Sequence, residues 1–106
     1  MTTFDKRKDE AEARYKHDQK LEFKANARRN KLLGLWAAEQ MGITGKSAEA
    51  YAKEVVLADL ERPGDDDVLE KVLKDLTDKG LDISEHRVRG EMDRLMDVAR
   101  EQVRNE

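Results

Sequence analysis

The stretch LLGLWAA, residues 32–38, decides the fold of this 106-residue chain. Wound into a helix, its apolar side chains point in nearly every direction, which predicts a helix that is covered on more than one side. Gly34 in the middle of this helix costs about 1 kcal/mol relative to alanine, and it is tolerated where a neighbouring helix passes close by. We therefore predict that this helix is the central one of a bundle. For Trp36 two interpretations remain open, a core residue or a partly exposed residue that docks a partner.

Four segments show the apolar periodicity and the end signals of helices. The central helix is expected over residues 19–41, with Asp18 as its N-cap and Gly42 as its stop. The three further helices are expected from Thr44 to about Glu61, from Asp65 to Lys79 and from Ser84 to the C-terminus. No segment has the alternation of a strand, so the fold class is all-α, an antiparallel four-helix bundle. Residues 1–19 have only a thin apolar stripe, and the resemblance described below favours a loosely attached, partly helical segment. The alternative, which composition alone favours, is an extension of the first helix with no specific role.

The composition excludes several classes of protein. Charged residues make up 42% of the chain and hydrophobic residues 38%, but the net charge is only -3, so a small packed core is possible. The chain has no cysteine, which excludes disulfides and thiolate zinc sites. Neither a secretory signal nor an apolar run of transmembrane length is found, so we expect a cytoplasmic protein that does not insert into a membrane.

Charge is distributed unevenly along the chain. Residues 1–31 carry 10 basic and 6 acidic side chains, whereas residues 32–106 carry 11 basic and 18 acidic ones. A basic N-terminal part followed by an acidic remainder suggests that the two parts of the chain have different roles. Arg28, Arg29 and Lys31 form a dense basic cluster, but acidic residues outnumber basic ones overall, so nucleic acid is not an expected partner. The cluster is predicted either to be a solvated face or to pair with acidic helices across the bundle.

Gly45, Lys46 and Ser47 resemble the end of a phosphate-binding loop. The full motif needs a glycine where Gln40 stands and a strand before it, and here a helix is expected instead. A weaker possibility is loose binding of a nucleotide or phosphate by free N–H groups at a helix start, with Lys46 beside them. The alternative that we favour is a helix connection with a solvated lysine.

No other constellation carries chemistry. His17 and His86 lack the spacing of metal ligands on one helix face, and Asp65 to Asp67 lack the alternate ligands of a calcium loop, so helix capping explains them better. No nucleophile and base can be paired. We therefore expect that the protein is not an enzyme, and that it binds no metal and no cofactor beyond the weak nucleotide site.

Three stretches resemble the zeta subunit family of alphaproteobacterial F-type ATP synthases. They are FKANARRNKLLGLWAAEQMG at 23–42, AYAKEVVLADLERPGDDDV at 50–68 and FDKRKDEAEARYKHD at 4–18. The resemblance covers essentially the whole chain. It implies a small four-helix bundle that inhibits ATP hydrolysis by the catalytic head, contacts catalytic subunits and the central stalk, and is peripheral to the membrane through the ATP synthase. A sealed four-helix core permits a monomer when the chain is free.

The resemblance also implies a division of labour. Residues 1–19 would be an inhibitory arm and residues 20–106 a four-helix anchoring bundle. The arm's contact stripe, at spacings of 7 and 4, would be Phe4, Ala11 and Tyr15. Four basic residues would steer the arm toward acidic surfaces: Lys6, Arg7, Lys8 and Arg14. Such an arm can insert as a helix between a catalytic subunit and the rotating stalk and block rotation without chemistry of its own.

The sequence departs from the family pattern in the arm. Ala11 stands where the arm often carries a second aromatic residue, and Lys16 is more polar than the small residue expected there. Losing an aromatic contact costs a few kcal/mol of burial, so inhibitory strength does not carry over with the fold. Two other functions stay open: a bundle that senses a nucleotide at residues 45–47, and a generic helical interaction module.

Overall fold

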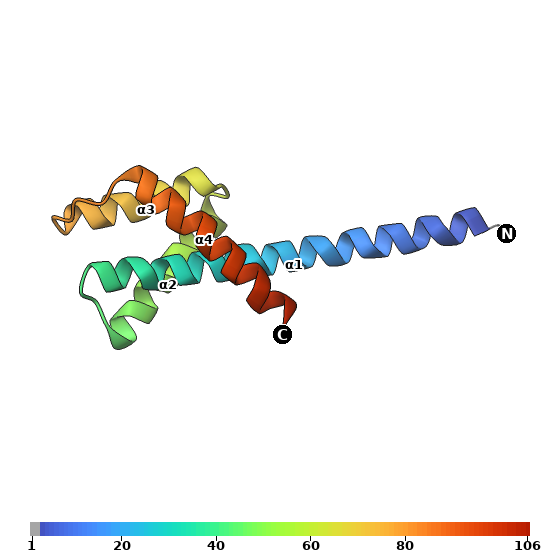
Figure 1. Cartoon of the computed structure of the whole chain (residues 1–106), viewed down its shortest axis with the longest axis horizontal. Coiled ribbons are helices and arrows are strands. Elements are labelled where there is room, and N and C mark those ends of the chain that lie inside the picture. Colours follow the sequence, from blue (N-terminus) through green and yellow to red (C-terminus); the bar gives the residue numbers. More distant parts are fainter. Residues whose placement is uncertain (1–2) are drawn as a thin grey trace.

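The protein is all-α, as predicted. The computed structural model describes the backbone of residues 3–106 and the side chains of residues 18–106. Four helices follow one another along the chain, and the described part contains no strand (Figure 1). They are α1 (Thr3–Gln40), α2 (Gly45–Glu61), α3 (Asp65–Asp78) and α4 (Glu85–Arg104). The chain reverses direction at each connection, which gives the predicted four-helix bundle.

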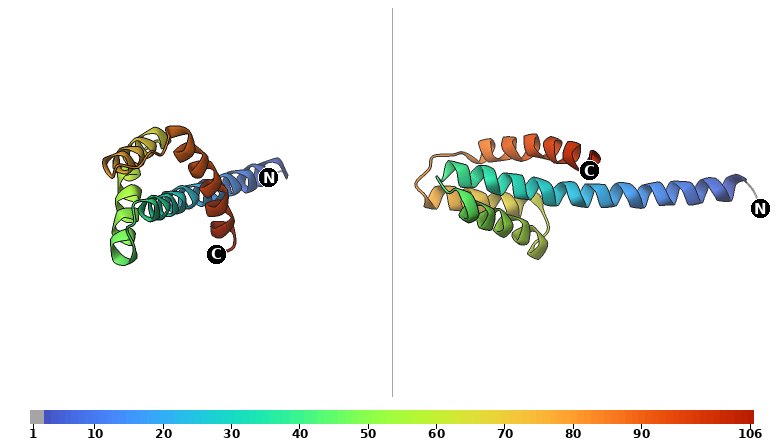
Figure 2. Two further views of the ribbon diagram at one scale, coloured as in Figure 1. Left: turned by 60° about the vertical axis from the view of Figure 1, so that its left-hand side comes forward. Right: turned by 90° about the horizontal axis from the view of Figure 1, so that it is seen from below.

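Helix α1 includes the N-terminal segment, as the alternative of an extended first helix predicted. The predicted start at residue 19 with Asp18 as N-cap is wrong, because the helix begins at Thr3 and continues through Asp18 without a break. The physical reason is composition: alanine, glutamate, lysine and arginine dominate here, and no glycine or proline occurs before Gly34. The N-terminal part of α1 therefore extends beyond the other three helices as one continuous rod (Figures 1 and 2).

The helix C-termini follow the glycine signals in the sequence. Helix α1 ends in a Schellman motif, in which Gly42 has a φ of 76° and the Ile43 N–H donates to the Ala38 carbonyl at 2.8 Å. Helix α3 ends in the same way, with Gly80 at a φ of 78° and the Leu81 N–H donating to the Leu76 carbonyl at 3.1 Å. Both endings were predicted.

Two of the predicted N-caps occupy their expected positions but behave differently. Ser84 precedes α4, and its hydroxyl accepts a hydrogen bond from the Arg87 N–H at 3.1 Å. Thr44 precedes α2 with an extended backbone, but its side chain makes no capping hydrogen bond. Thr44 therefore occupies the N-cap position, but its side chain does not cap the helix.

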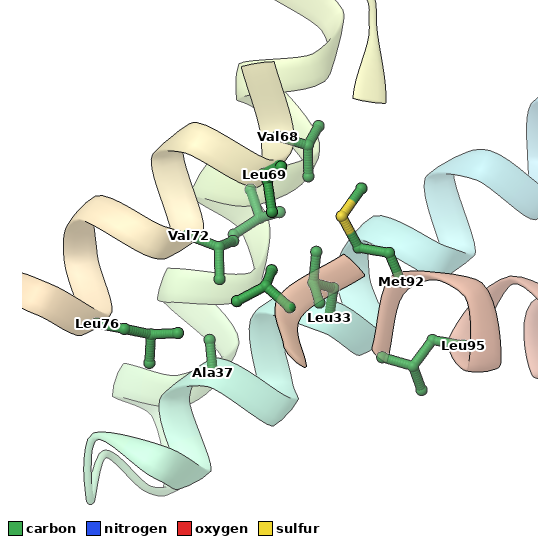
Figure 3. Packing of buried hydrophobic residues seen from close by; sticks show 10 residues of the cluster. Leu33, Ala37, Val68, Leu69, Val72, Leu76, Met92 and Leu95 are labelled. Atoms are coloured by element: carbon green, nitrogen blue, oxygen red, sulfur yellow. The ribbon is translucent and has the colours of Figure 1, made fainter. Parts of the chain in front are cut away.

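The four helices bury one common core. Helix α1 packs mainly against α2 and α4, and α3 closes the remaining side. The largest fully buried apolar side chains come from all four helices and are Leu33, Val55, Val68, Val72, Leu76 and Val88. Figure 3 shows Leu33 of α1, Val72 of α3 and Leu95 of α4 pointing toward this common centre. The stretch that decided the fold thus supplies the middle of the core.

Candidate functional site

The predicted arm occupies the N-terminal part of α1. Its side chains, those of Phe4, Lys6, Arg7, Lys8, Ala11, Arg14 and Tyr15, lie outside the described residues, whereas the backbone there is helical from Thr3 onward. On a continuous helix, spacings of 7 and 4 place Phe4, Ala11 and Tyr15 on one face. The arm assignment and the boundary at residue 19 both remain predictions.

The C-terminal half of α4 holds α1 directly after this segment. The Arg100 guanidinium lies 2.7 Å from the Glu22 carboxylate, and the hydrogen bond from Arg100 lowers the pKa of Glu22. Six residues further along α1, Arg28 donates to Gln102 at 2.9 Å and pairs with Glu106. Ala25, between them in the sequence, is buried. Two cross-helix ion pairs therefore connect α1 to the bundle just past the predicted arm.

A polar network fixes α1 against the connection between α2 and α3. Arg29 is almost fully buried and lies 2.7 Å from the Asp65 carboxylate, while its Nε donates to Asn30 at 2.8 Å. Asn30, also buried, donates to Asp59 of α2 at 3.0 Å. Asp59 in turn accepts a hydrogen bond from the Gly64 N–H at 3.2 Å. No buried polar side-chain atom in the described part lacks a partner.

This network decides between the two predictions for the basic cluster. Arg28 and Arg29 pair with acidic residues across the bundle, as the second alternative stated. Lys31 is exposed and makes no ion pair in the described part. The aspartates at the start of α3 occupy its first turn as predicted. Asp65 also balances the buried charge of Arg29, a role that spacing alone did not indicate.

Trp36 belongs to the edge of the core. Its indole is half-buried against the core cluster, and the Arg87 guanidinium lies 6.0 Å from the centre of the ring. The large hydrophobic side chains that are exposed in the described part are others, Phe23, Leu57 and Leu60. Leu57 and Leu60 escaped the sequence analysis because they stand outside the apolar stripe of their helix. That position could have identified them as exposed apolar residues, although not as part of a groove.

Phe23 and Leu60 line an open groove between α1 and the end of α2. The groove has a volume of about 330 Å³, and its apolar walls include Ala27, Val56 and Pro63. Its polar edge is formed by the Asn30, Asp59 and Gly64 network described above. This surface was not predicted as a site, because its residues come from three separate stretches of sequence.

Gly45, Lys46 and Ser47 are exposed at the start of α2. Gly45 has a φ of 62°, and helix α1 precedes the connection instead of the strand that a phosphate-binding loop requires. Weak nucleotide binding there stays a prediction. Amide NMR shifts near Gly45 during titration with millimolar ATP test it directly, and their absence would contradict it.

No group of three or more histidine or acidic side chains in the described part could hold a metal ion; His86 is exposed in the first turn of α4, and His17 lies outside the described side chains. None of the described helices is both long and apolar enough to cross a membrane.

Comparison with known proteins identifies the family of the chain and a similar solved structure. The family model of the ATPase inhibitor subunit zeta matches residues 1–102. This chain belongs to that family. A solution NMR structure is similar to the zeta-family chain, with 50% sequence identity and a TM-score of 0.71; the match covers 80% of this chain and 96% of the other. A search of curated proteins returns no match.

The family membership confirms the resemblance on which the sequence analysis relied. The zeta family is named for inhibiting an ATPase, so inhibition of ATP hydrolysis is the general function of this chain, and the ATP synthase is the partner that it implies. A subunit of this kind is regulatory. The match includes the N-terminal part of α1 as well as the bundle, because it begins at residue 1.

Proposed function

We propose that this zeta-family chain inhibits ATP hydrolysis by the catalytic head of an F-type ATP synthase, with residues 1–19 as the inhibitory arm and residues 20–106 as the anchor. The observation that carries the proposal is the shape of α1. The helix leaves the bundle as a continuous rod, and residues 3–19 span about 25 Å at 1.5 Å per residue (Figure 1). A rod of that length can reach into a groove that a compact bundle cannot enter.

The inhibition needs no chemistry on the part of the inhibitor. A helix inserted between a catalytic subunit and the central stalk blocks rotation by filling space, and hydrolysis stops because catalysis is coupled to rotation. Phe4, Ala11 and Tyr15 provide the apolar face toward the groove. Lys6, Arg7, Lys8 and Arg14 favour approach to acidic surfaces before the contact forms.

The bundle's task is to keep the arm at the enzyme. Once the bundle is bound, insertion of the arm becomes intramolecular, and its effective concentration depends on the connection between the two parts. The Glu22–Arg100 and Arg28–Glu106 pairs hold the base of the arm to α4 and to the residues that follow it. A stiff base limits the directions in which the arm points and lowers the entropy lost when it inserts.

The test is ATP hydrolysis by the cognate purified catalytic head, titrated with the full chain, with Tyr15→Asp and with residues 20–106. We expect inhibition by the full chain, and loss of inhibition without loss of binding for the other two. Circular dichroism confirms that both remain folded, and His86→Asp, an exposed position on α4, is the matched control. Equal inhibition by the full chain and by residues 20–106 would refute the arm assignment.

A further inference from the structure

An exposed apolar patch covers neighbouring parts of α1 and α2. We define it as Phe23, Val56, Leu57 and Leu60. Phe23 is 64% exposed, Leu60 56% and Leu57 46%. Every other large hydrophobic side chain in the described part is buried or half-buried. Their concentration on two adjoining helices distinguishes the patch from the isolated apolar residues that any surface carries. The three exposed side chains of the patch lie outside the core cluster, so core packing does not explain apolar residues here in so polar a chain.

The patch is held in a fixed shape. Phe23 of α1 and both Val56 and Leu60 of α2 line the groove between the two helices. The Asn30–Asp59 hydrogen bond and the Asp59–Gly64 hydrogen bond join the elements that carry these side chains. A surface that is already ordered loses little entropy when a partner binds to it.

Unpaired cations border the patch. Lys20, Lys24 and Lys31 follow one another at spacings of 4 and 7 on α1, with Ala27 of the groove on the same face. Lys53 stands one turn before Leu57 on α2. All four lysines are exposed, and none makes an ion pair within the described part.

Three carboxylates lie near the groove and the patch, those of Asp59, Glu61 and Asp65. Both oxygens of Asp59 accept hydrogen bonds, from Asn30 and from the Gly64 N–H. Asp65 is paired with the buried Arg29. Asp59 nevertheless keeps its negative charge, because both of its donors are neutral, and the exposed Glu61 follows Leu60 directly. The four lysines outnumber these two carboxylates, so the charge of this surface is positive on balance, although the chain as a whole is acidic.

We propose that this patch docks an acidic amphipathic helix of the ATP synthase catalytic head. An apolar groove between two helices accepts the apolar ridge of a third helix, and the lysine border pairs with acidic residues beside that ridge. The inference rests on the proposed function, since it names the surface by which the bundle anchors. Phe23 stands only four residues after the predicted arm, so the arm and the patch can engage the same head together.

A second copy of the chain is a poorer occupant. A symmetric dimer through the patch would place the same surface on both sides of the contact. The lysine border of one copy would then face the lysine border of the other, and like charges opposed across an interface weaken it. The acidic helix has the complementary charge.

The first test measures binding of the full chain to the purified cognate catalytic head. We expect Leu60→Glu to raise the Kd at least about tenfold, as truncating or charging an anchor residue does. The pair Lys24→Glu and Lys31→Glu should raise the Kd about tenfold at low salt and less at high salt, because salt screens the attraction. His86→Glu is the control for the first variant, and Lys74→Glu with Lys79→Glu, two exposed lysines at the end of α3, is the control for the second.

The outcomes separate the two proposals. If the wild-type chain binds and inhibits, and the patch variants bind equally well while folded, the docking surface is refuted and the proposed function stands. If the wild-type chain neither binds nor inhibits the head, both are refuted. A photocrosslinker at position 60 gives a second readout: crosslinks to an acidic helix of the head support the proposal, whereas crosslinks only to a second copy of the chain overturn it.

Discussion

The Cα of Ala52 lies so close to Gly34 that a Cβ added to Gly34 would be 2.5 Å away from it. A contact that short with backbone cannot be relieved by a side-chain rotation, so α1 and α2 would have to separate. The Cβ of Ala52 and a methyl group of Val55 lie near the same point, at 3.1 and 3.2 Å. Because Gly34 has no Cβ, α1 and α2 can cross at this short distance.

Gly34→Ala is expected to destabilise the protein. Alanine gains about 1 kcal/mol of helix propensity, but overpacking a filled contact costs about 1–3 kcal/mol and here moves backbone. We expect a net loss of about 1–2 kcal/mol in the free energy of unfolding, measured by urea denaturation. Gly90→Ala is the matched control, because Gly90 lies within α4 with no atom near its added Cβ. That variant should gain about 0.5–1 kcal/mol. Equal gains in both variants would contradict the close crossing.

Asp65→Asn is expected to cost about 1–2 kcal/mol. The substitution keeps a hydrogen-bond acceptor for Arg29 but leaves its buried charge without a counter-ion. The cost is less than for a fully buried pair, because the Asp65 side chain is 66% exposed. Asp66→Asn is the control: it removes the same charge from the first turn of α3, but its partner Arg89 is at the surface. Thermal unfolding of the two variants at one pH should show a clearly larger drop for Asp65→Asn.

The sequence analysis succeeded where a local signal decides the structure. Gly42 and Gly80 ended their helices because positive φ is accessible to glycine, and the LLGLWAA stretch predicted a central helix with a close neighbour at Gly34. It left open whether residues 1–19 extend the first helix, although composition favoured the extension, and its N-cap at Asp18 was wrong. No signal other than Asp18 marked a helix start near residue 19, and a single capping residue does not stop a helix that good helix formers continue.

The candidate site was less accessible to prediction than the fold. The arm residues could be named only through the family resemblance, since a thin stripe of Phe4, Ala11 and Tyr15 has no physical signature of inhibition. The groove could not be named at all. Phe23 and Leu60 meet there because α1 and α2 cross at Gly34, and 37 positions of sequence separate them. Tertiary packing creates such a surface, and periodicity within either helix alone does not reveal it.

The pKa of Glu22 should reveal the connection between α1 and α4. The hydrogen bond from Arg100 lowers this pKa below its usual value of 4.5. A lowered carboxyl pKa stabilises the folded state above the unfolded-state pKa, and this contribution is lost as the pH falls through the folded-state pKa. Since both side chains are exposed, the contribution is small. Carboxyl NMR titration should show the Glu22 midpoint rising toward 4.5 in Arg100→Gln, with no such rise in Arg94→Gln, whose guanidinium pairs with Glu91.

Ala11→Phe is expected to strengthen inhibition. The substitution restores an aromatic side chain between Phe4 and Tyr15 on the predicted contact stripe, and burying it against the catalytic head adds about 1.5–3 kcal/mol, more than a tenfold gain in affinity. Ala13→Phe is the matched control, because residue 13 lies on the opposite face of the same helix turn. The half-inhibitory concentration for ATP hydrolysis should fall at least about tenfold for Ala11→Phe and stay near wild type for Ala13→Phe. If both variants gained equally, added hydrophobicity and not the stripe would set the strength of inhibition; if neither gained, the face assigned to the arm would be wrong.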